Sequence, residues 1–209
     1  RAQIGLACAA LPIFPLPRVV LMPRDLLPLH VFEPRYRALV AHCLAGDHVF
    51  AIATLRPRYE CEYLASPPIF GELGVGRIVS HQPLEDGRCN LVLEAVGRAR
   101  VLEELVTEHP LRVVRTALCE DVAAETSLSD LRSLLLQLGV YAERVSDEAT
   151  RLVGMPDADM VDELARRMLE EPDERRRYLA TDRVVDRARM LQERLLELMA
   201  SGKDPVGDA

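Results

Sequence analysis

The feature that most constrains the fold of this 209-residue chain is a change in the spacing of its apolar residues near residue 122. Before that point the apolar residues come in short, partly alternating stretches separated by turn-forming residues, which is typical of β-strands. Beyond it they recur every three or four residues over longer segments, which is typical of amphipathic helices. We therefore predict an α+β protein with a β domain over residues 1–122 and an α-helical domain over residues 123–209.

The first domain is predicted to contain several short strands. These cover residues 11–16, 26–32, 49–55, 73–81, 89–96, 98–105 and 111–118. Asp86 and Gly87 form a hairpin-turn dipeptide between two of them. The proline-containing stretch 56–72 is predicted to be a loop. Short strands with turns between them indicate a closed or nearly closed barrel.

One helix, over residues 34–44, is predicted to interrupt the sheet. Pro34 suits the first helical turn and Gly46 suits the C-cap. Four apolar residues at helical spacing are predicted to form its buried face: Tyr36, Leu39, Val40 and Cys43.

The second domain is predicted to consist of four helices. Ser127 would cap the first, and Asp130 follows at capping-box spacing. The second begins at Asp157 and ends before Pro172; a short one covers residues 173–179, and Thr181 would cap the last. Their predicted buried residues are, in order, Leu131, Leu135, Leu138, Ala142 and Val145; Met160, Val161, Leu164, Met168 and Leu169; and Val184, Ala188, Leu191, Leu195 and Leu198.

The chain contains a single lysine, Lys203, close to its end. A P-loop needs a lysine to reach the β- and γ-phosphates, and a Ser–Lys dyad needs one as its base, so the sequence argues against an ATPase and against such a protease. The densest glycine cluster, Gly71, Gly74 and Gly76, opens a strand rather than a helix, so we interpret these as bulge or turn glycines. We predict no catalytic residue, no cofactor and no enzymatic activity.

The five cysteines and five histidines form no recognisable metal motif. No C-x-x-C or H-x-x-x-H spacing occurs, so no metal site is predicted. We interpret the cysteines as reduced, mostly buried thiols of a cytoplasmic protein. His42 precedes Cys43, but neighbouring helix residues point in different directions; His30 is interpreted as a core or rim histidine. A Cys–His pair brought together only by the fold is kept as an enzymatic alternative.

The net charge of −7 and the pI near 5.3 argue against a nucleic-acid partner. The basic triplet 175–177 is flanked by acidic residues and is interpreted as a salt-bridged helix face. No apolar run is long enough to cross a membrane, so no membrane partner is predicted.

Several motifs resemble those of one protein family. The segment Leu11-Pro-Ile-Phe-Pro-Leu16 is followed by Val19-Val-Leu-Met-Pro23 and by Leu27-Pro-Leu-His-Val-Phe-Glu-Pro-Arg-Tyr36. Further matches are Gly76-Arg-Ile-Val79, Asp86-Gly-Arg-x-Asn90 and Arg98-x-Arg-Val101. Together they resemble the N-terminal domain of Lon proteases, and most of all the small bacterial proteins that consist of this domain alone. The resemblance covers residues 11–200.

This resemblance implies a PUA-like β-barrel followed by a helical subdomain. It also implies a non-catalytic, cytoplasmic module that binds unfolded or degron-bearing polypeptides, or another protein of a proteolytic system. Glu33 and Arg35 are interpreted as a pair that fixes the start of the helix. Arg24 and Ala95 stand where many members carry glycine.

The predicted peptide contacts are Met22, Pro23 and Leu26, because apolar residues at a turn between strands are hard to bury. The competing hypothesis is RNA binding, by analogy with PUA folds. It requires a basic patch built from Arg56, Arg58, Arg77, Arg88, Arg98 and Arg100.

Overall fold

The computed structural model describes residues 9–59, 66–107, 111–123, 128–133, 151–152 and 154–200. The chain divides into two compact units, Arg1–Cys119 and Glu120–Ala209. The predicted domain boundary at residue 122 stays a prediction. None of the helices in the described ranges is long and apolar enough to cross a membrane.

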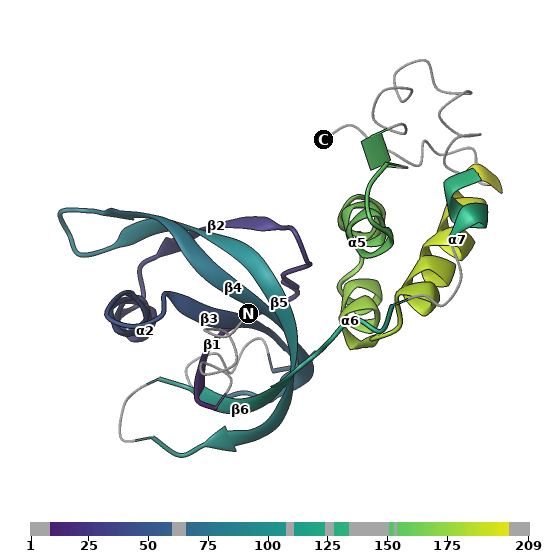
Figure 1. The fold of residues 1–209 in the computed structure, drawn as a ribbon. Helices are drawn as coiled ribbons and strands as arrows, with labels where there is room; N and C mark the ends of the chain where they lie inside the picture. Colours follow the sequence, from purple (N-terminus) through teal and green to yellow (C-terminus); the bar gives the residue numbers. More distant parts are fainter. Residues whose placement is uncertain are drawn as a thin grey trace. The chain divides into compact units, whose positions relative to one another are not determined.

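Among its described residues, the first unit holds a six-stranded sheet and one helix (Figure 1). Its elements are β1 (Leu11–Leu16), β2 (Leu26–Val31), α2 (Pro34–Leu44), β3 (Val49–Leu55), β4 (Ile69–Pro83), β5 (Cys89–Leu105) and β6 (Val113–Leu118). The strand order is β2-β5-β4-β3-β1-β6, and β5 also pairs with β6. Strands β5, β4, β3, β1 and β6 therefore form a closed circuit, which confirms the predicted barrel. Strand β2 is not part of this circuit and pairs with β5 alone.

Strand β5 closes the barrel because it is long enough to serve two partners. Its first part pairs with β2, as in Leu27↔Leu93, and its last part pairs with β6, as in Arg100↔Ala117. The prediction of two separate strands, 89–96 and 98–105, is therefore wrong. The pairing with β4 shifts between Val75 and Gly76, and such a bulge bends a strand without ending it.

The predicted loop 56–72 is too long by four residues, because β4 already begins at Ile69. Leu55 pairs with Ile69, and the backbone N–H of Arg56 donates to the carbonyl of Pro68 at 3.0 Å. Pro67 and Pro68 favoured a loop in the sequence. A proline is nevertheless compatible with the start of a strand, and here both precede it.

The β unit has two hydrophobic cores. One is drawn from all five strands of the closed circuit: Leu11, Ile13, Val49, Ala51, Ala53, Leu73, Val75, Ala99 and Val114. The other packs α2 against the sheet through the predicted face of the helix, Tyr36, Leu39, Val40 and Cys43, all of which are buried. From Val49 to Ala53, β3 supplies residues to the two cores in alternation, and all seven residues of the strand are buried.

Helix α2 covers Pro34–Leu44 as predicted, but its C-cap is not the predicted Gly46. Its C-cap is Ala45, in right-handed conformation, and the left-handed backbone conformation falls on His48 (φ 61°) instead of Gly46. The N–H groups of Gly46 and His48 both donate to the carbonyl of Cys43 at 3.0 Å. The chain thus reverses after the helix without using the conformational freedom of its glycine.

The glycine cluster of β4 allows close packing. A Cβ atom on Gly74 would lie 2.1 Å from the carbonyl oxygen of Leu21, and one on Gly76 would lie 2.3 Å from Cγ of Leu93. The pairing shifts beside Gly76, but the extra residue of this bulge is Val96 in β5, so Gly76 is not itself a bulge residue; its missing side chain leaves room for Leu93. At Gly74 the reason is different, because the absent side chain lets the backbone that leads into β2 pass directly over the strand.

The second unit contains α5 (Asp157–Met168), α6 (Pro172–Ala180) and α7 (Val184–Ala200), and residues 129–133 are helical as well. The predicted stripes are confirmed where they are described, including Leu131, Met160, Leu164, Leu191 and Leu195. Ser127, Leu135, Leu138, Ala142, Val145 and the side chain of Leu198 lie outside the described residues.

The prediction that Thr181 caps the last helix is wrong. Its hydroxyl donates to the carbonyl of Arg177 at 2.9 Å, so it caps the end of α6. The start of α7 is instead held by the segment that enters the unit: Val122 N–H donates to the carbonyl of Asp182, and Val184 N–H donates to that of Val122, both at 3.0 Å.

An ion-pair network is buried among the helices. The guanidinium of Arg187 is fully buried and donates to Asp162 at 2.7 Å and to Asp121 at 2.6 Å. The hydroxyl of Tyr178 donates to the same oxygen of Asp162 at 2.6 Å. The network ties α5, α6 and α7 to the segment that enters the unit, and no apolar periodicity predicted it.

Candidate functional site

The strands β2, β5 and β4 present one face to solvent. In β2 the odd-numbered residues pack against the core and the even-numbered residues are exposed. Residues directly opposite each other in antiparallel strands share a face, so the register extends this surface over β5 and β4. We call it the outer sheet face, and its residues are Leu26, Pro28, His30, Phe32, Arg77, Val79, Ser80, Gln82, Asn90, Val92 and Glu94.

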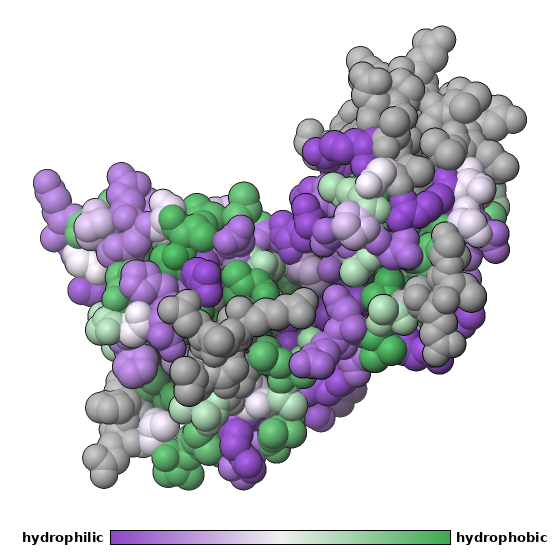
Figure 2. All heavy atoms as spheres, viewed as in Figure 1, coloured by the Kyte–Doolittle hydropathy of each residue, from purple (hydrophilic) through white to green (hydrophobic). Residues whose placement is uncertain are grey.

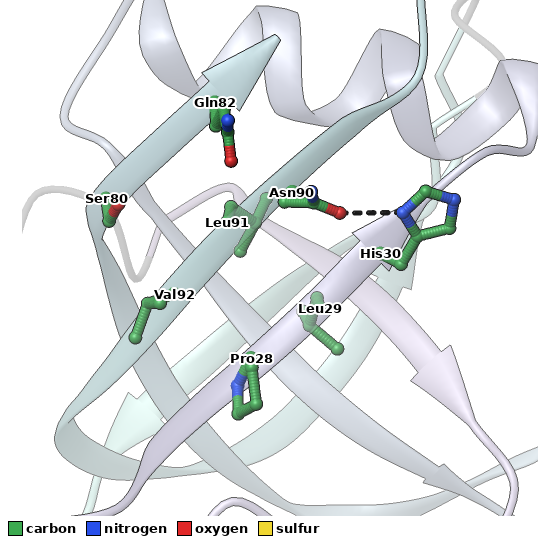
Figure 3. Close-up of a pocket in the computed structure, with 8 residues that line it drawn as sticks. All are labelled: Pro28, Leu29, His30, Ser80, Gln82, Asn90, Leu91 and Val92. Carbon is green, nitrogen blue, oxygen red and sulfur yellow. Dashed lines mark hydrogen bonds between the residues drawn. The ribbon is translucent and has the colours of Figure 1, made fainter. Parts of the chain in front are cut away.

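An open pocket of about 390 Å³ lies on the outer sheet face. It is lined by Pro28, Leu29, His30, Ser80, Gln82, Asn90, Leu91 and Val92 (Figure 3). Asn90 points along the sheet toward His30, and its Oδ1 lies 2.7 Å from the imidazole Nδ1. Because Oδ1 can only accept, Nδ1 carries the proton. The bond uses the acceptor of Asn90, so its Nδ2 donors can serve another partner.

Large exposed apolar side chains also belong to the outer sheet face. Leu26 is 63% exposed, Phe32 is 58% exposed, and Val79, the bulge residue opposite Val92, is 50% exposed. The rings of His30 and Phe32 stack with centroids 6.1 Å apart. Hydrophobic surface is visible on the upper part of the barrel unit, where Figure 1 places β2 (Figure 2). Apolar side chains around amide and hydroxyl groups suit a partner that is itself apolar with a polar backbone.

The three predicted contact residues are not equivalent in the structure. Met22 and Pro23 are buried, whereas Leu26 is exposed on the outer sheet face. The turn that separates them is held by Asp25, whose carboxylate accepts from Met22 N–H at 3.0 Å. Arg24 has a φ of 69°, the left-handed region that favours glycine. A role of Met22 and Pro23 in peptide contact stays a prediction and requires this turn to open.

The pocket residues His30, Gln82 and Asn90 are functional candidates that the sequence interpretation did not single out. The sequence predicts a core or rim position for His30, and in the structure its side chain is exposed. The sequence signal that could have identified this surface is the alternation in residues 26–32, since it places Leu26 and His30 on the same face of the strand.

The two buried thiols, Cys43 and Cys89, do not have the surroundings of a nucleophile. Burial raises the pKa of the Cys43 thiol to about 12. Burial also raises the pKa of Cys89, partly offset by the charge of Arg37. His42 is exposed while Cys43 is buried, as expected for neighbours on a helix. No group of three potential metal ligands occurs in the parts of the chain that are described.

Three of the six arginines proposed for an RNA-binding patch are buried or have other contacts. Arg98 is buried, and Arg88 donates to Asp86 at 2.5 Å. Arg56 donates to the carbonyl of Ile69 at 3.1 Å and lies over the ring of Phe70.

At the start of α2, Arg35 donates to Glu33 at 3.0 Å, so these two residues do form a pair.

Comparisons with known proteins converge on one family. Residues 10–197 match the model of the ATP-dependent protease La (LON) substrate-binding domain. Among curated proteins, Lon protease 2 of Myxococcus xanthus is 29% identical over 143 residues, which is 68% of this chain and 16% of that protein. The Lon protease of Anaeromyxobacter dehalogenans is 28% identical over 151 residues, 69% of this chain and 18% of that protein. The chain thus spans less than a fifth of the length of these relatives.

Two solved structures share the fold. A Lon N-terminal domain protein from Xanthomonas campestris superposes with a TM-score of 0.62 at 26% identity, covering 91% of this chain and 97% of that one. The N-terminal domain of a Mycobacterium avium complex Lon protease gives a TM-score of 0.63 at 14% identity, covering 90% and 98%. With the family match over residues 10–197, these findings show that the chain belongs to the LON substrate-binding domain family.

Proposed function

We propose that this chain is a non-catalytic module that binds unfolded or degron-bearing polypeptides on its outer sheet face, in the cytoplasm and within a proteolytic system. Its family supports the class of partner, since the matched domain is a substrate-binding domain. Another protein of the same proteolytic system is a further partner of the same chemical class.

The observation that carries the proposal is the combination, on one surface, of exposed apolar side chains with a pocket that also contains amide and hydroxyl groups. Fully burying a Leu or Phe side chain contributes about 1.5–3 kcal/mol, so covering the exposed parts of Leu26 and Phe32 contributes about 1–2 kcal/mol each. The amides of Asn90 and Gln82 and the hydroxyl of Ser80 supply donors and acceptors for a peptide backbone. No observation favours RNA in the same way.

Fluorescence anisotropy with a labelled, reduced and carboxymethylated lactalbumin as the unfolded probe tests the proposal. Saturable binding that persists at high salt is expected, because burial of apolar surface is not screened by ions. A labelled single-stranded RNA is titrated in parallel. Salt-sensitive RNA binding without binding of the unfolded probe would replace this proposal with the RNA-binding hypothesis.

A matched pair of variants locates the surface. Leu26→Ser removes an apolar group from the outer sheet face, and Leu102→Ser removes one that is 58% exposed in the part of β5 that does not pair with β2. Leu26→Ser is expected to weaken binding about 5- to 30-fold, and Leu102→Ser to leave it unchanged. Equal effects of the two substitutions would show that the outer sheet face is not the binding surface.

A further inference from the structure

Strand β2 has one hydrogen-bonding edge that no described strand covers. In the sheet order it stands at the end, next to β5 alone. The backbone N–H of Ala95 donates to the carbonyl of Asp25 at 2.9 Å, one residue before β2 begins. In an antiparallel pair, hydrogen-bonded positions alternate with positions whose backbone groups point the other way. Residues 27, 29 and 31 therefore bond to β5, and residues 26, 28 and 30 direct their backbone groups to the open edge.

The open edge presents five backbone groups. Leu26 and His30 each supply an N–H and a carbonyl, and Pro28 supplies only a carbonyl because it has no N–H. The position of Pro28 agrees with this assignment, since a proline within a sheet belongs where its missing donor would face away from the neighbouring strand. A row of such groups is a template for a further strand.

We infer that the polypeptide partner docks as an added β-strand along the open edge of β2, between Leu26 and His30; this rests on the proposed function and specifies its mode. An extended segment satisfies the five edge groups through its own backbone. Every second side chain of the added strand then lies on the outer sheet face, beside Leu26 and His30 and next to the amide-lined pocket. Recognition is through the backbone together with alternate apolar side chains, so the partner is extended and apolar rather than helical.

Pro28 makes a second copy of this chain a poor occupant of the same edge. Two β2 edges paired antiparallel would place Pro28 opposite Pro28, and the central pair of hydrogen bonds would be lost. A partner of other sequence supplies an N–H to the Pro28 carbonyl and loses one bond only. The edge is therefore blunted against self-association while it stays open to a client strand.

The primary test is a backbone N-methyl scan of the client. An array of overlapping peptides from the lactalbumin probe identifies the shortest binding fragment, and each of its amides is then methylated in turn. We expect an alternating pattern: methylation at every second residue weakens binding by about tenfold or more, and methylation at the residues between changes Kd less than about twofold. A profile without alternation overturns strand addition while binding of the fragment upholds the proposed function. Failure of every fragment and of the intact probe to bind overturns both.

A pair of substitutions at His30 tests the same inference from the protein side. His30→Ala removes the imidazole and keeps the backbone N–H, whereas His30→Pro removes both. Since this N–H faces away from β5, the ladder inside the sheet is preserved in each variant, and circular dichroism confirms that each is folded. We expect His30→Pro to bind at least about threefold more weakly than His30→Ala. Equal affinities of two folded variants would contradict the assignment of this edge, and the N-methyl scan on the unaltered protein decides the matter if His30→Pro does not fold.

Discussion

The buried guanidinium of Arg187 provides the sharpest test of how the helical unit is held together. It bonds to Asp162 at 2.7 Å and to Asp121 at 2.6 Å, and these carboxylates come from α5 and from the segment that enters the unit. The substitution Arg187→Met keeps part of the aliphatic stem and removes the charge. Any loss of stability then reports mainly on the ion pairs rather than on a large cavity.

The expected loss follows from the surroundings of the two carboxylates. Asp162 is buried, and the substitution removes its bond to the guanidinium while the bond from the Tyr178 hydroxyl stays. Removing one partner of a buried ion pair costs about 3–5 kcal/mol, because the remaining charge is left without compensation. The side chain of Asp121 is 38% exposed, so water replaces much of its interaction. We therefore expect Asp121→Asn to cost about 1 kcal/mol or less.

Urea denaturation followed by helical circular dichroism measures these free energies, since α5, α6 and α7 all belong to this unit. The double variant Arg187→Met with Asp162→Asn is the decisive control. It removes the uncompensated charge, so it should be more stable than Arg187→Met alone. The reasoning is refuted if Arg187→Met costs less than about 1 kcal/mol, or if the double variant is no more stable than the single one.

Three further predictions concern single residues. Gly74→Ala should destabilise the barrel by about 1–3 kcal/mol or more in thermal and urea unfolding, because its Cβ would meet the Leu21 carbonyl; a stability equal to that of the unaltered protein would contradict the close approach. Burial alone would raise the pKa of Glu163, but hydrogen bonds from two neighbouring arginines outweigh it and lower the pKa to about 2. The pKa of Glu163 in the folded protein is thus below its unfolded value of 4.5. On the order of 3 kcal/mol of stability is therefore present above pH 4.5 and is lost as the pH falls toward 2. The substitution Glu163→Gln should abolish this part of the pH dependence of stability. The Cys43 thiol, with a pKa of about 12, should resist iodoacetamide in the folded protein, and its rapid alkylation, read by mass spectrometry, would show that the site is open.

Local patterns in the sequence predicted the parts of the fold that depend on neighbouring residues. The spacing of Tyr36, Leu39, Val40 and Cys43 identified the buried face of α2 because a helix repeats every 3.6 residues whatever it packs against. The Asp86–Gly87 turn follows from the same kind of evidence: Gly87 has a φ of 79°, which few other residues adopt.

Features that depend on distant segments were not predictable in this way. Two apolar stretches around Val96 and Gly97 look like separate strands, and only their partners show that β5 continues through a bulge. Arg187 reads as a polar residue on an amphipathic helix until Asp121 and Asp162 are brought to it. Long-range pairing decides both cases, and one sequence contains no direct signal of it.

Strand β2 shows why a correctly predicted element can still leave the site undetermined. The sequence Leu26–Val31 alternates between two sets of residues, and the alternation alone states that they face opposite sides. It does not state which side is covered, because both sets contain apolar residues. The strand order decides which side is covered. The backbone groups of Leu27 and Leu29 bond to β5, and their side chains pack against the core. The exposed face of β2 and its edge, interrupted by Pro28, are where we propose that a client polypeptide binds.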